Sequence, residues 1–219
     1  MTKSFDLIVF DWDGTLMDST AHIVYAIQHA AADLGLPIPS AESARQVIGL
    51  SLQAALETAC PDLPLQRHQE MASAYRKHYV AGDGAAVLFD GVADGLRELT
   101  ARGVTLAVAT GKSRRGLNQA LEATGLRAHF AATRTQDDCP SKPHPAMLLE
   151  LMEQLGVTAQ RTLMVGDTTF DLSMAQQAGS HAVGMCYGAH EREALQRHAP
   201  LDLFEDFHGL RRWLAQRLD

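Results

Sequence analysis

Four short segments of the sequence combine carboxylates with a hydroxyl and an ammonium group. They hold Asp11 and Asp13, Thr110 and Gly111, Lys142, and Asp167 and Asp171. If Asp11, Asp13 and Asp167 shared one site, their charges would repel one another, and burial would increase that repulsion. A hard cation such as Mg²⁺ resolves the conflict, because it prefers carboxylate and carbonyl oxygens as ligands. The residue types therefore predict a magnesium site.

The other members of these segments suit a phosphate group. Thr110 offers a hydroxyl, and Gly111 offers a backbone N–H at the start of a predicted helix, where anions commonly bind. Lys142 adds a positive charge for phosphoryl oxygens. The structural alternative is that each aspartate caps a helix and that the lysine is simply exposed. That alternative accounts for any one residue, but not for four carboxylates that converge with a lysine.

The elements that must position these groups alternate between strand and helix. Short apolar runs typical of buried parallel strands lie at 5–11, 104–110, 162–167 and 181–185. Helical patterns lie between the later runs and end at glycines. This alternation predicts an α/β fold, a Rossmann-like parallel sheet with right-handed crossovers. Ligands bind beyond the carboxyl ends of such strands, where the polar segments stand.

Residues 16–87 interrupt this alternation. They contain helical patterns separated by prolines and glycines, and no convincing strand. The sequence therefore predicts a core of residues 1–15 and 88–219 with an α-helical cap, residues 16–87, inserted after the first strand. The linkers at 16–20 and 81–90 are the expected hinges, and cap closure would exclude water from the site.

Composition limits the partners and the compartment. The 219 residues carry a net charge of −7, and no basic face is visible, which argues against nucleic acid as a partner. Three cysteines are far apart in the sequence and form no Cys-x-x-Cys motif, which favours a reducing compartment. The first apolar run, residues 7–10, is too short for the apolar region of a signal peptide, and no apolar run is long enough to span a membrane. We expect a cytoplasmic monomer or homodimer with no membrane partner.

Together, the four segments resemble the motifs of the haloacid dehalogenase superfamily. The matching positions, in order, are Asp11-x-Asp13-Gly14-Thr15, Thr110, Lys142 and Gly166-Asp167-x-x-x-Asp171. The helical insert after the first motif resembles the helical-cap branch of that superfamily, which includes the phosphoglycolate phosphatases. Any one of these motifs alone is weakly specific, whereas the set of four is highly specific.

The resemblance implies a covalent mechanism. Asp11 would attack phosphorus in line and form an aspartyl-phosphate. Asp13 would protonate the leaving alcohol and would then activate the hydrolytic water. Haloacid dehalogenases lack an acid–base aspartate at the second position, so the resemblance favours a phosphotransferase over a dehalogenase. The implied activity is hydrolysis of a phosphomonoester.

The resemblance also implies a ligand set for the cation. The carboxylates of Asp11 and Asp167 and the backbone carbonyl of Asp13 would hold Mg²⁺. Asp171 would act through water or by orienting Lys142. The groups expected to bind the phosphoryl oxygens belong to Thr110, Gly111 and Lys142.

The cap determines the substrate in this superfamily. Residues 48–52 resemble the specificity loop of phosphoglycolate phosphatase-like members, and Arg45 is expected to meet a substrate carboxylate. A helix break at Gly49 and an exposed arginine are the structural alternative. The expected substrate is a small phosphorylated metabolite, with 2-phosphoglycolate as the candidate.

Two other functions stay open. One is a β-phosphoglucomutase-like sugar-phosphate mutase, although Ile23 stands where those mutases carry a cap histidine and His22 is adjacent. The other is a non-catalytic phospho-ligand binding protein, which would be expected to have lost one of the motif residues. The stretch 22–34 also contains no lysine of the kind that phosphonatases use.

Overall fold

The centre of the fold is a parallel sheet. The structure, a computed structural model, describes residues 4–81 and 87–218. Within these residues six strands pair in the order β5-β4-β1-β6-β7-β8, and every neighbouring pair is parallel. The strands are β1 Leu7–Phe10, β4 Thr105–Thr110, β5 Ala132–Thr135, β6 Thr162–Gly166, β7 His181–Met185 and β8 Leu203–Phe204. The predicted α/β class is confirmed.

Two strands of this sheet were not expected from the sequence. β5 has the sequence Ala-Thr-Arg-Thr, with two half-buried residues at its centre, so it lacks the apolar run of a central strand. β8 has only two residues. Both lie at the edges of the sheet, where one side of the strand is unpaired and apolar patterning is weak.

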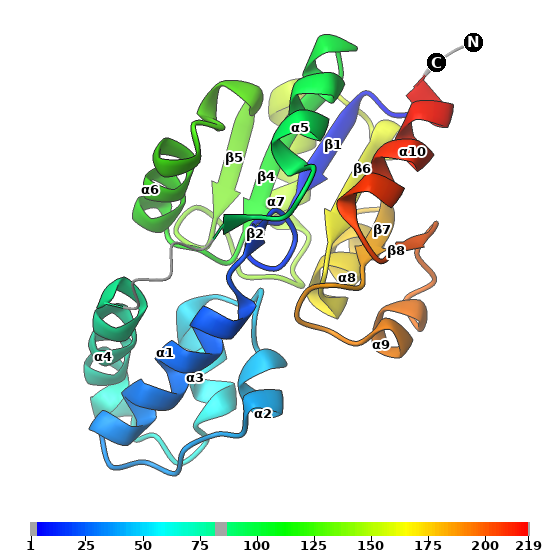
Figure 1. The fold of residues 1–219 in the computed structure, drawn as a ribbon. Coiled ribbons are helices and arrows are strands. Elements are labelled where there is room, and N and C mark those ends of the chain that lie inside the picture. The colour runs from blue at the N-terminus through cyan, green and yellow to red at the C-terminus, as the bar shows by residue number, and fades with distance from the viewer. Residues whose placement is uncertain (1–3, 82–86, 219) are drawn as a thin grey trace.

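Register brings the predicted motifs to one edge of the sheet. β1 lies between β4 and β6, and Phe10 is paired with both Val108 and Val165. The strand arrows of β1, β4 and β6 point toward helices α1 to α4 (Figure 1). Asp11 and Asp167, which follow β1 and β6, therefore meet at the carboxyl end of the sheet, where Thr110 ends β4.

Helices cover both faces of the sheet. Side chains alternate along each strand, so Ile8 and Phe10 of β1 face one apolar cluster and Leu7 and Val9 face another. The first cluster includes residues of α5 Val92–Ala101, α6 Arg114–Thr124 and α10 Phe207–Leu218. The second includes residues of α7 Ala146–Leu155 and α8 Thr169–Gln177. Shorter helices are α9 Arg192–Gln196 and the 3₁₀ turns η1 Leu65–Arg67, η2 Arg127–His129 and η3 Ala159–Arg161.

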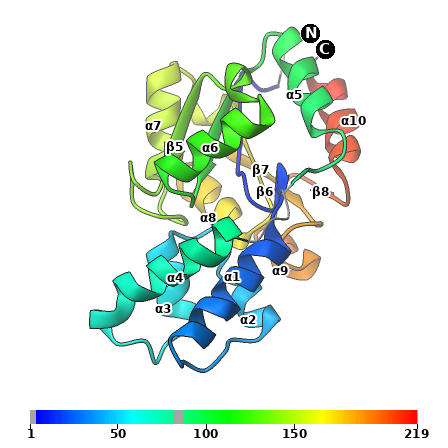
Figure 2. The same cartoon turned by 60° about the vertical axis from the view of Figure 1, so that its left-hand side comes forward.

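A separate group of helices lies at the carboxyl end of the sheet (Figures 1 and 2). These are α1 Thr20–Asp33, α2 Ala41–Arg45, α3 Leu52–Ala59 and α4 His68–Ala81. They enclose an apolar cluster of their own, in which Ile27, Leu56 and Met71 are almost completely buried. The predicted division into core and cap stays a prediction. None of the described helices is both long enough and apolar enough to cross a membrane.

The chain enters and leaves this helical group through two short strands. β2 Met17–Asp18 pairs antiparallel with β3 Val87–Leu88. The expectation that residues 16–87 contain no strand was therefore wrong, because two-residue strands are too short to show a period. The expected hinge at 81–90 includes residues 82–86, which lie outside the described residues.

A loop of the helical group rests directly on the core. The backbone N–H of Ser51 donates to Ser141 Oγ at 2.8 Å, and that of Leu52 donates to Gln136 Oε1 at 2.7 Å. A Cβ atom on Gly111 would lie 2.3 Å from the carbonyl oxygen of Leu50. Glycine is therefore required at position 111 for the two loops to approach this closely.

Candidate active site

A buried cluster of three carboxylates lies at the carboxyl end of the sheet. Oxygen atoms of Asp11, Asp167 and Asp171 lie within 4.8 Å of one another, and all three residues are buried. Asp11 follows β1 directly, Asp167 follows β6, and Asp171 lies in the first turn of α8. The sequence reasoning predicted that these residues would come together. It expected Asp171 to act through water or by orienting Lys142, and Asp171 Oδ1 does accept from Lys142 Nζ at 2.7 Å, in addition to lying within the cluster.

Lys142 is the cation of this cluster. Its Nζ lies 2.7 Å from Asp11 Oδ1 and 2.7 Å from Asp171 Oδ1. The residue is only 1% exposed, so both ion pairs are shielded from water. One ammonium group facing three carboxylates leaves the cluster with an excess of negative charge when all three are ionised.

The raised pKa values of Asp11 and Asp167 reflect their burial first and the neighbouring negative charges second. Burial raises the pKa of Asp11 to about 7, against the lowering effect of the Lys142 ammonium. Burial, together with the charges of Asp11 and Asp171, holds the pKa of Asp167 well above its ordinary value. Burial would lower the pKa of Lys142, but the two carboxylates that it contacts raise it. A further positive charge would stabilise the ionised carboxylates.

The donor atoms fit a hard divalent cation. Both oxygens of Asp11 are buried, and neither accepts a hydrogen bond of good geometry from any described residue, although Oδ1 lies in ion-pair range of Lys142. Asp167 is held in place, since Oδ1 accepts from Thr15 Oγ1 and Oδ2 accepts from the backbone N–H of Ala189, each at 2.7 Å. An unpartnered buried carboxylate oxygen within an acidic cluster suits Mg²⁺.

The carboxylate of Asp167 lies in close contact with the backbone of a glycine, Gly14. Gly14 has a φ of +82°, and a Cβ on it would lie 2.2 Å from Asp167 Oδ2. Two features therefore require glycine at position 14: its left-handed backbone and its close contact with the carboxylate of Asp167.

Asp171 has a structural role as well as its ion pair. Its Oδ2 accepts from the backbone N–H and from the hydroxyl of Thr168, and the pair forms the capping box at the start of α8. The capping alternative therefore applies to Asp171. It does not replace the contact with Lys142, because the two contacts use different oxygens.

The carboxylate of Asp13 is not one of the three that lie within 4.8 Å of one another. Its carboxylate accepts from Lys112 Nζ at 3.0 and 2.9 Å and from Ser19 Oγ at 2.6 Å. Lys112 Nζ also donates to Tyr79 Oη of α4 at 2.9 Å. Lys112 is a site residue that sequence reasoning missed. Its position directly after Gly111, at the end of β4, was the available signal.

A cavity of about 850 Å³ opens beside Asp11 and Asp13. Thr110, Gly111 and Lys112 line it from the core. His22 of α1 also lines it and pairs with the backbone carbonyl of Tyr79 at 2.6 Å. Of the buried cluster, Asp11 is the residue that lines the cavity, so it is the carboxylate available to a ligand. Arg45, expected to meet a substrate carboxylate, is instead exposed at the end of α2 and does not line this cavity.

The fold and the site define a class of enzyme. A parallel sheet carries a carboxylate nucleophile candidate, a lysine and an acidic cluster at its carboxyl end, beneath an inserted group of helices. Residues 8–185 match the family described as haloacid dehalogenase-like hydrolase. The chain belongs to this family, as its motifs predicted.

Relatives and solved structures agree with this assignment. The chain is 38% identical over 207 residues to a probable phosphatase IndB of Dickeya dadantii, and the match covers 92% of this chain and 90% of the relative. It is 30% identical over 211 residues to a phosphoglycolate phosphatase of Pseudomonas putida, covering 93% and 78%. A solved structure described as a predicted phosphoglycolate phosphatase from Haemophilus somnus has a TM-score of 0.86 at 28% identity, covering 97% of this chain and 99% of that one.

Proposed function

We propose that this chain is a Mg²⁺-dependent phosphatase that hydrolyses a small phosphorylated metabolite through an aspartyl-phosphate on Asp11. The observation that carries the proposal is the state of the Asp11 carboxylate. It is buried, faces the cavity, accepts no hydrogen bond of good geometry, and lies 2.7 Å from the Lys142 ammonium. Oδ2 of Asp11, the oxygen for which no partner is found among the described residues, keeps its lone pairs available for attack on phosphorus.

The first step is an in-line displacement. An Asp11 oxygen forms a bond to phosphorus while the bond between phosphorus and the ester oxygen breaks, and Asp13 transfers a proton to the departing alkoxide. In the second step Asp13 takes a proton from water, whose oxygen attacks phosphorus and releases Asp11 and inorganic phosphate. Lys142 and the Thr110 hydroxyl are the groups we assign to the phosphoryl oxygens.

Mg²⁺ would be held by the carboxylates of Asp11 and Asp167 and the backbone carbonyl of Asp13. When bound, it neutralises charge on the phosphoryl group and on the cluster. Lys142 remains paired with Asp171, which fixes the direction of its ammonium group toward Asp11.

The relatives suggest a first substrate. Several are named phosphoglycolate phosphatase, so 2-phosphoglycolate is the candidate with which we would begin. A solved structure from Bacteroides vulgatus that is described as a β-phosphoglucomutase has a TM-score of 0.87 at 18% identity. At this identity the likeness shows a shared fold and nothing about the reaction. Nothing in the contacts of His22 favours the mutase over the phosphatase, because its ring is engaged with Tyr79.

Release of inorganic phosphate from a panel of phosphomonoesters tests the proposal. The panel includes 2-phosphoglycolate and p-nitrophenyl phosphate, and each ester is assayed with Mg²⁺ and with EDTA. We expect turnover that requires Mg²⁺ and that falls by about a thousandfold or more in Asp11→Asn. Asp33→Asn is the matched control, since Asp33 is a carboxylate on the outer surface of α1.

Two outcomes would contradict the proposal. Phosphate release that persists in Asp11→Asn would remove Asp11 from the chemistry. Stable phosphorylation of Asp11 without steady release of phosphate, relieved by a sugar bisphosphate, would indicate a mutase instead.

A further inference from the structure

The charges around the cavity are distributed unevenly. The protein has 26 acidic and 19 Lys and Arg residues, so acidic side chains would be expected to predominate on an arbitrary surface. Among the described residues that line the cavity, however, the carboxylates are Asp11 and Asp13 alone. The other formally charged lining residues are Arg76, Lys112 and Arg115, all of them cations. Away from the proposed reacting carboxylates, the cavity is therefore electropositive.

The two arginines that line the cavity come from different parts of the chain. Arg76 belongs to α4 of the helical group, and Arg115 belongs to α6 of the core. In both views α4 lies below α6, so a cavity lined by both helices lies where the helical group meets the core (Figures 1 and 2). A ligand that contacted both guanidinium groups would connect the two parts of the chain.

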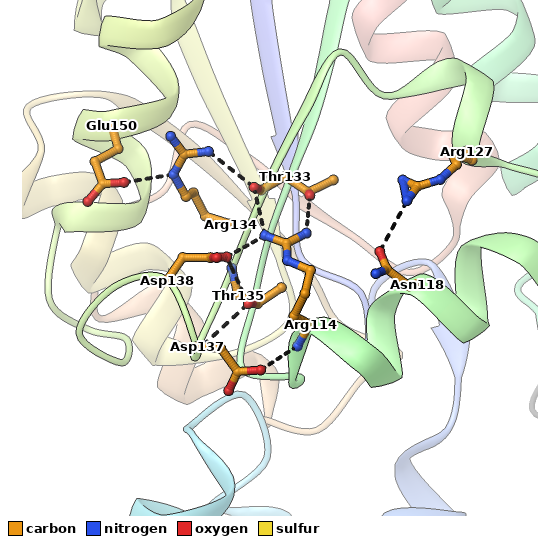
Figure 3. Close-up of polar contacts among 9 residues, drawn as sticks. All are labelled: Arg114, Asn118, Arg127, Thr133, Arg134, Thr135, Asp137, Asp138 and Glu150. Carbon is orange, nitrogen blue, oxygen red and sulfur yellow. Dashed lines mark hydrogen bonds and ion pairs between the residues drawn. The ribbon is translucent and has the colours of Figure 1, made fainter.

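Neither arginine is committed to a partner within residues 4–81 and 87–218. No ion pair or side-chain hydrogen bond joins Arg76 or Arg115 to another described residue. Lys112 differs, because Asp13 and Tyr79 already use its ammonium group. Arg114, next to Arg115, differs as well, since it is tied to Thr133 and Asp138 (Figure 3). The arginines that line the cavity are thus available to an anion.

The size and walls of the cavity indicate the rest of the ligand. Pockets of roughly 300–1,000 Å³ enclose ligands of about drug size, and this cavity measures about 850 Å³. A two-carbon acid would occupy a small part of that volume. Much of the wall is apolar, from Ile23 and Ile27 of α1, from Ile48 and Leu50 of the loop that rests on the core, and from Leu52 at the start of α3. An extended body with apolar surface fits these walls.

We infer that the substrate is a phosphomonoester with a second anionic group, carried on a body long enough to reach Arg76 and Arg115 while its ester phosphate meets Asp11. This inference rests on the proposed phosphatase function and names its substrate class. A guanidinium group pairs with carboxylate or phosphate oxygens through two parallel N–H bonds, which gives direction as well as attraction. Arg76 and Arg115 are specificity-determining residues in this arrangement. Lys112 instead holds the carboxylate of Asp13.

A chain-length series tests the inference. Phosphate esters of ω-hydroxy carboxylic acids, from two carbons upward, are compared with phosphate esters of the matching ω-hydroxy carboxamides, which have the same shape but lack the carboxylate charge. The quantity measured is the ratio of kcat/KM for the acid to that for the amide. We expect the ratio to rise with chain length to about a hundredfold, and to fall about tenfold in Arg76→Met and in Arg115→Met. An α,ω-bisphosphate of the same length shows whether phosphate is preferred to carboxylate.

Arg212→Met is the matched control. Arg212 is an exposed arginine on α10 that does not line this cavity, so the ratio should not change. A ratio near one at every length would overturn the inference. So would a maximum at two carbons that neither cavity arginine affects.

A binding measurement distinguishes a failure of this inference from a failure of the proposed function. Calorimetric titration of the same esters into Asp11→Asn reports acid-over-amide preference without turnover. If the acids bind more tightly than the amides but no ester releases phosphate, the phosphatase proposal is contradicted and the anion site is supported. Phosphate release with no preference for acids, in binding or in turnover, would contradict the anion site alone.

Discussion

Lys112 and Asp13 form an ion pair of 2.9 Å in which each side chain is only 11% exposed. Because Tyr79 shares the same ammonium group, the pair connects the proposed acid–base carboxylate to helix α4. Lys112 Nζ also lies 5.0 Å from the centre of the Tyr79 ring, within the range of a cation–π interaction. The position of Asp13 therefore depends on a residue of the core and, through it, on the helical group.

Replacement of Lys112 tests this dependence. Lys112→Met removes the cation that holds Asp13, and we expect kcat to fall by about 10- to 100-fold, because proton transfer requires a positioned carboxylate. Tyr79→Phe removes one hydrogen bond and should lower kcat by less than about fivefold. Steady-state kinetics separates kcat from KM for both variants.

Lys77→Met is the control, since Lys77 is an exposed lysine on the same helix as Tyr79. Partial recovery in Lys112→Arg would indicate that the charge, rather than the shape, positions Asp13. Wild-type kcat in Lys112→Met would contradict the argument.

The buried cluster leads to a prediction about stability. Lys142→Met leaves Asp11, Asp167 and Asp171 without their cation, and removal of one partner from a buried ion pair costs about 3–5 kcal/mol. Urea unfolding at pH 8 in EDTA measures this loss. Adding Mg²⁺ should restore part of it, because the bound cation compensates for the missing ammonium group.

An exposed ion pair provides the comparison for this stability loss. Lys77 pairs with Asp33 at 3.3 Å on the surface, and Lys77→Met should change the free energy of unfolding by less than about 1 kcal/mol. Equal losses in the two lysine variants would show that the Lys142 cluster contributes no more than a surface pair.

The motif residues could be predicted from the sequence because strand order determines where they lie. Asp11, Thr110 and Asp167 each stand at the end of a strand, and β1, β4 and β6 are neighbours, so identifying the strands was sufficient. Lys112 follows β4 and could have been found in the same way, whereas Arg76 and Arg115 could not. Their places in the cavity depend on how the helical group packs against the core, and no local pattern encodes that packing.

Arg114 anchors the start of α6 to the edge strand β5. Its guanidinium group donates to the hydroxyl and the carbonyl of Thr133 and pairs with Asp138, and its backbone N–H donates to Asp137 (Figure 3). Arg114→Met should lower the free energy of unfolding by about 1–3 kcal/mol, since several partners lose a hydrogen bond. Urea unfolding provides the measurement.

Arg127, in the same region, provides the matched control for Arg114. Its guanidinium group makes one long hydrogen bond, 3.3 Å to Asn118 (Figure 3). We expect Arg127→Met to change stability by no more than about 0.5 kcal/mol. If both variants lose the same stability, the network around Arg114 contributes nothing beyond a single surface contact.

The thiol of Cys139 should be unreactive in the native protein. Burial, reinforced by the neighbouring Glu150 carboxylate, raises the pKa of Cys139 to about 11. The thiolate is the reactive form, so only about one thiol in a thousand is reactive at pH 8, and alkylation should accelerate as the pH rises toward the pKa. Iodoacetamide labelling read by mass spectrometry should modify the half-buried Cys186 before Cys139 at pH 8, and should modify both equally in urea. Labelling of native Cys139 as fast as Cys186 would show that its environment does not suppress the thiolate.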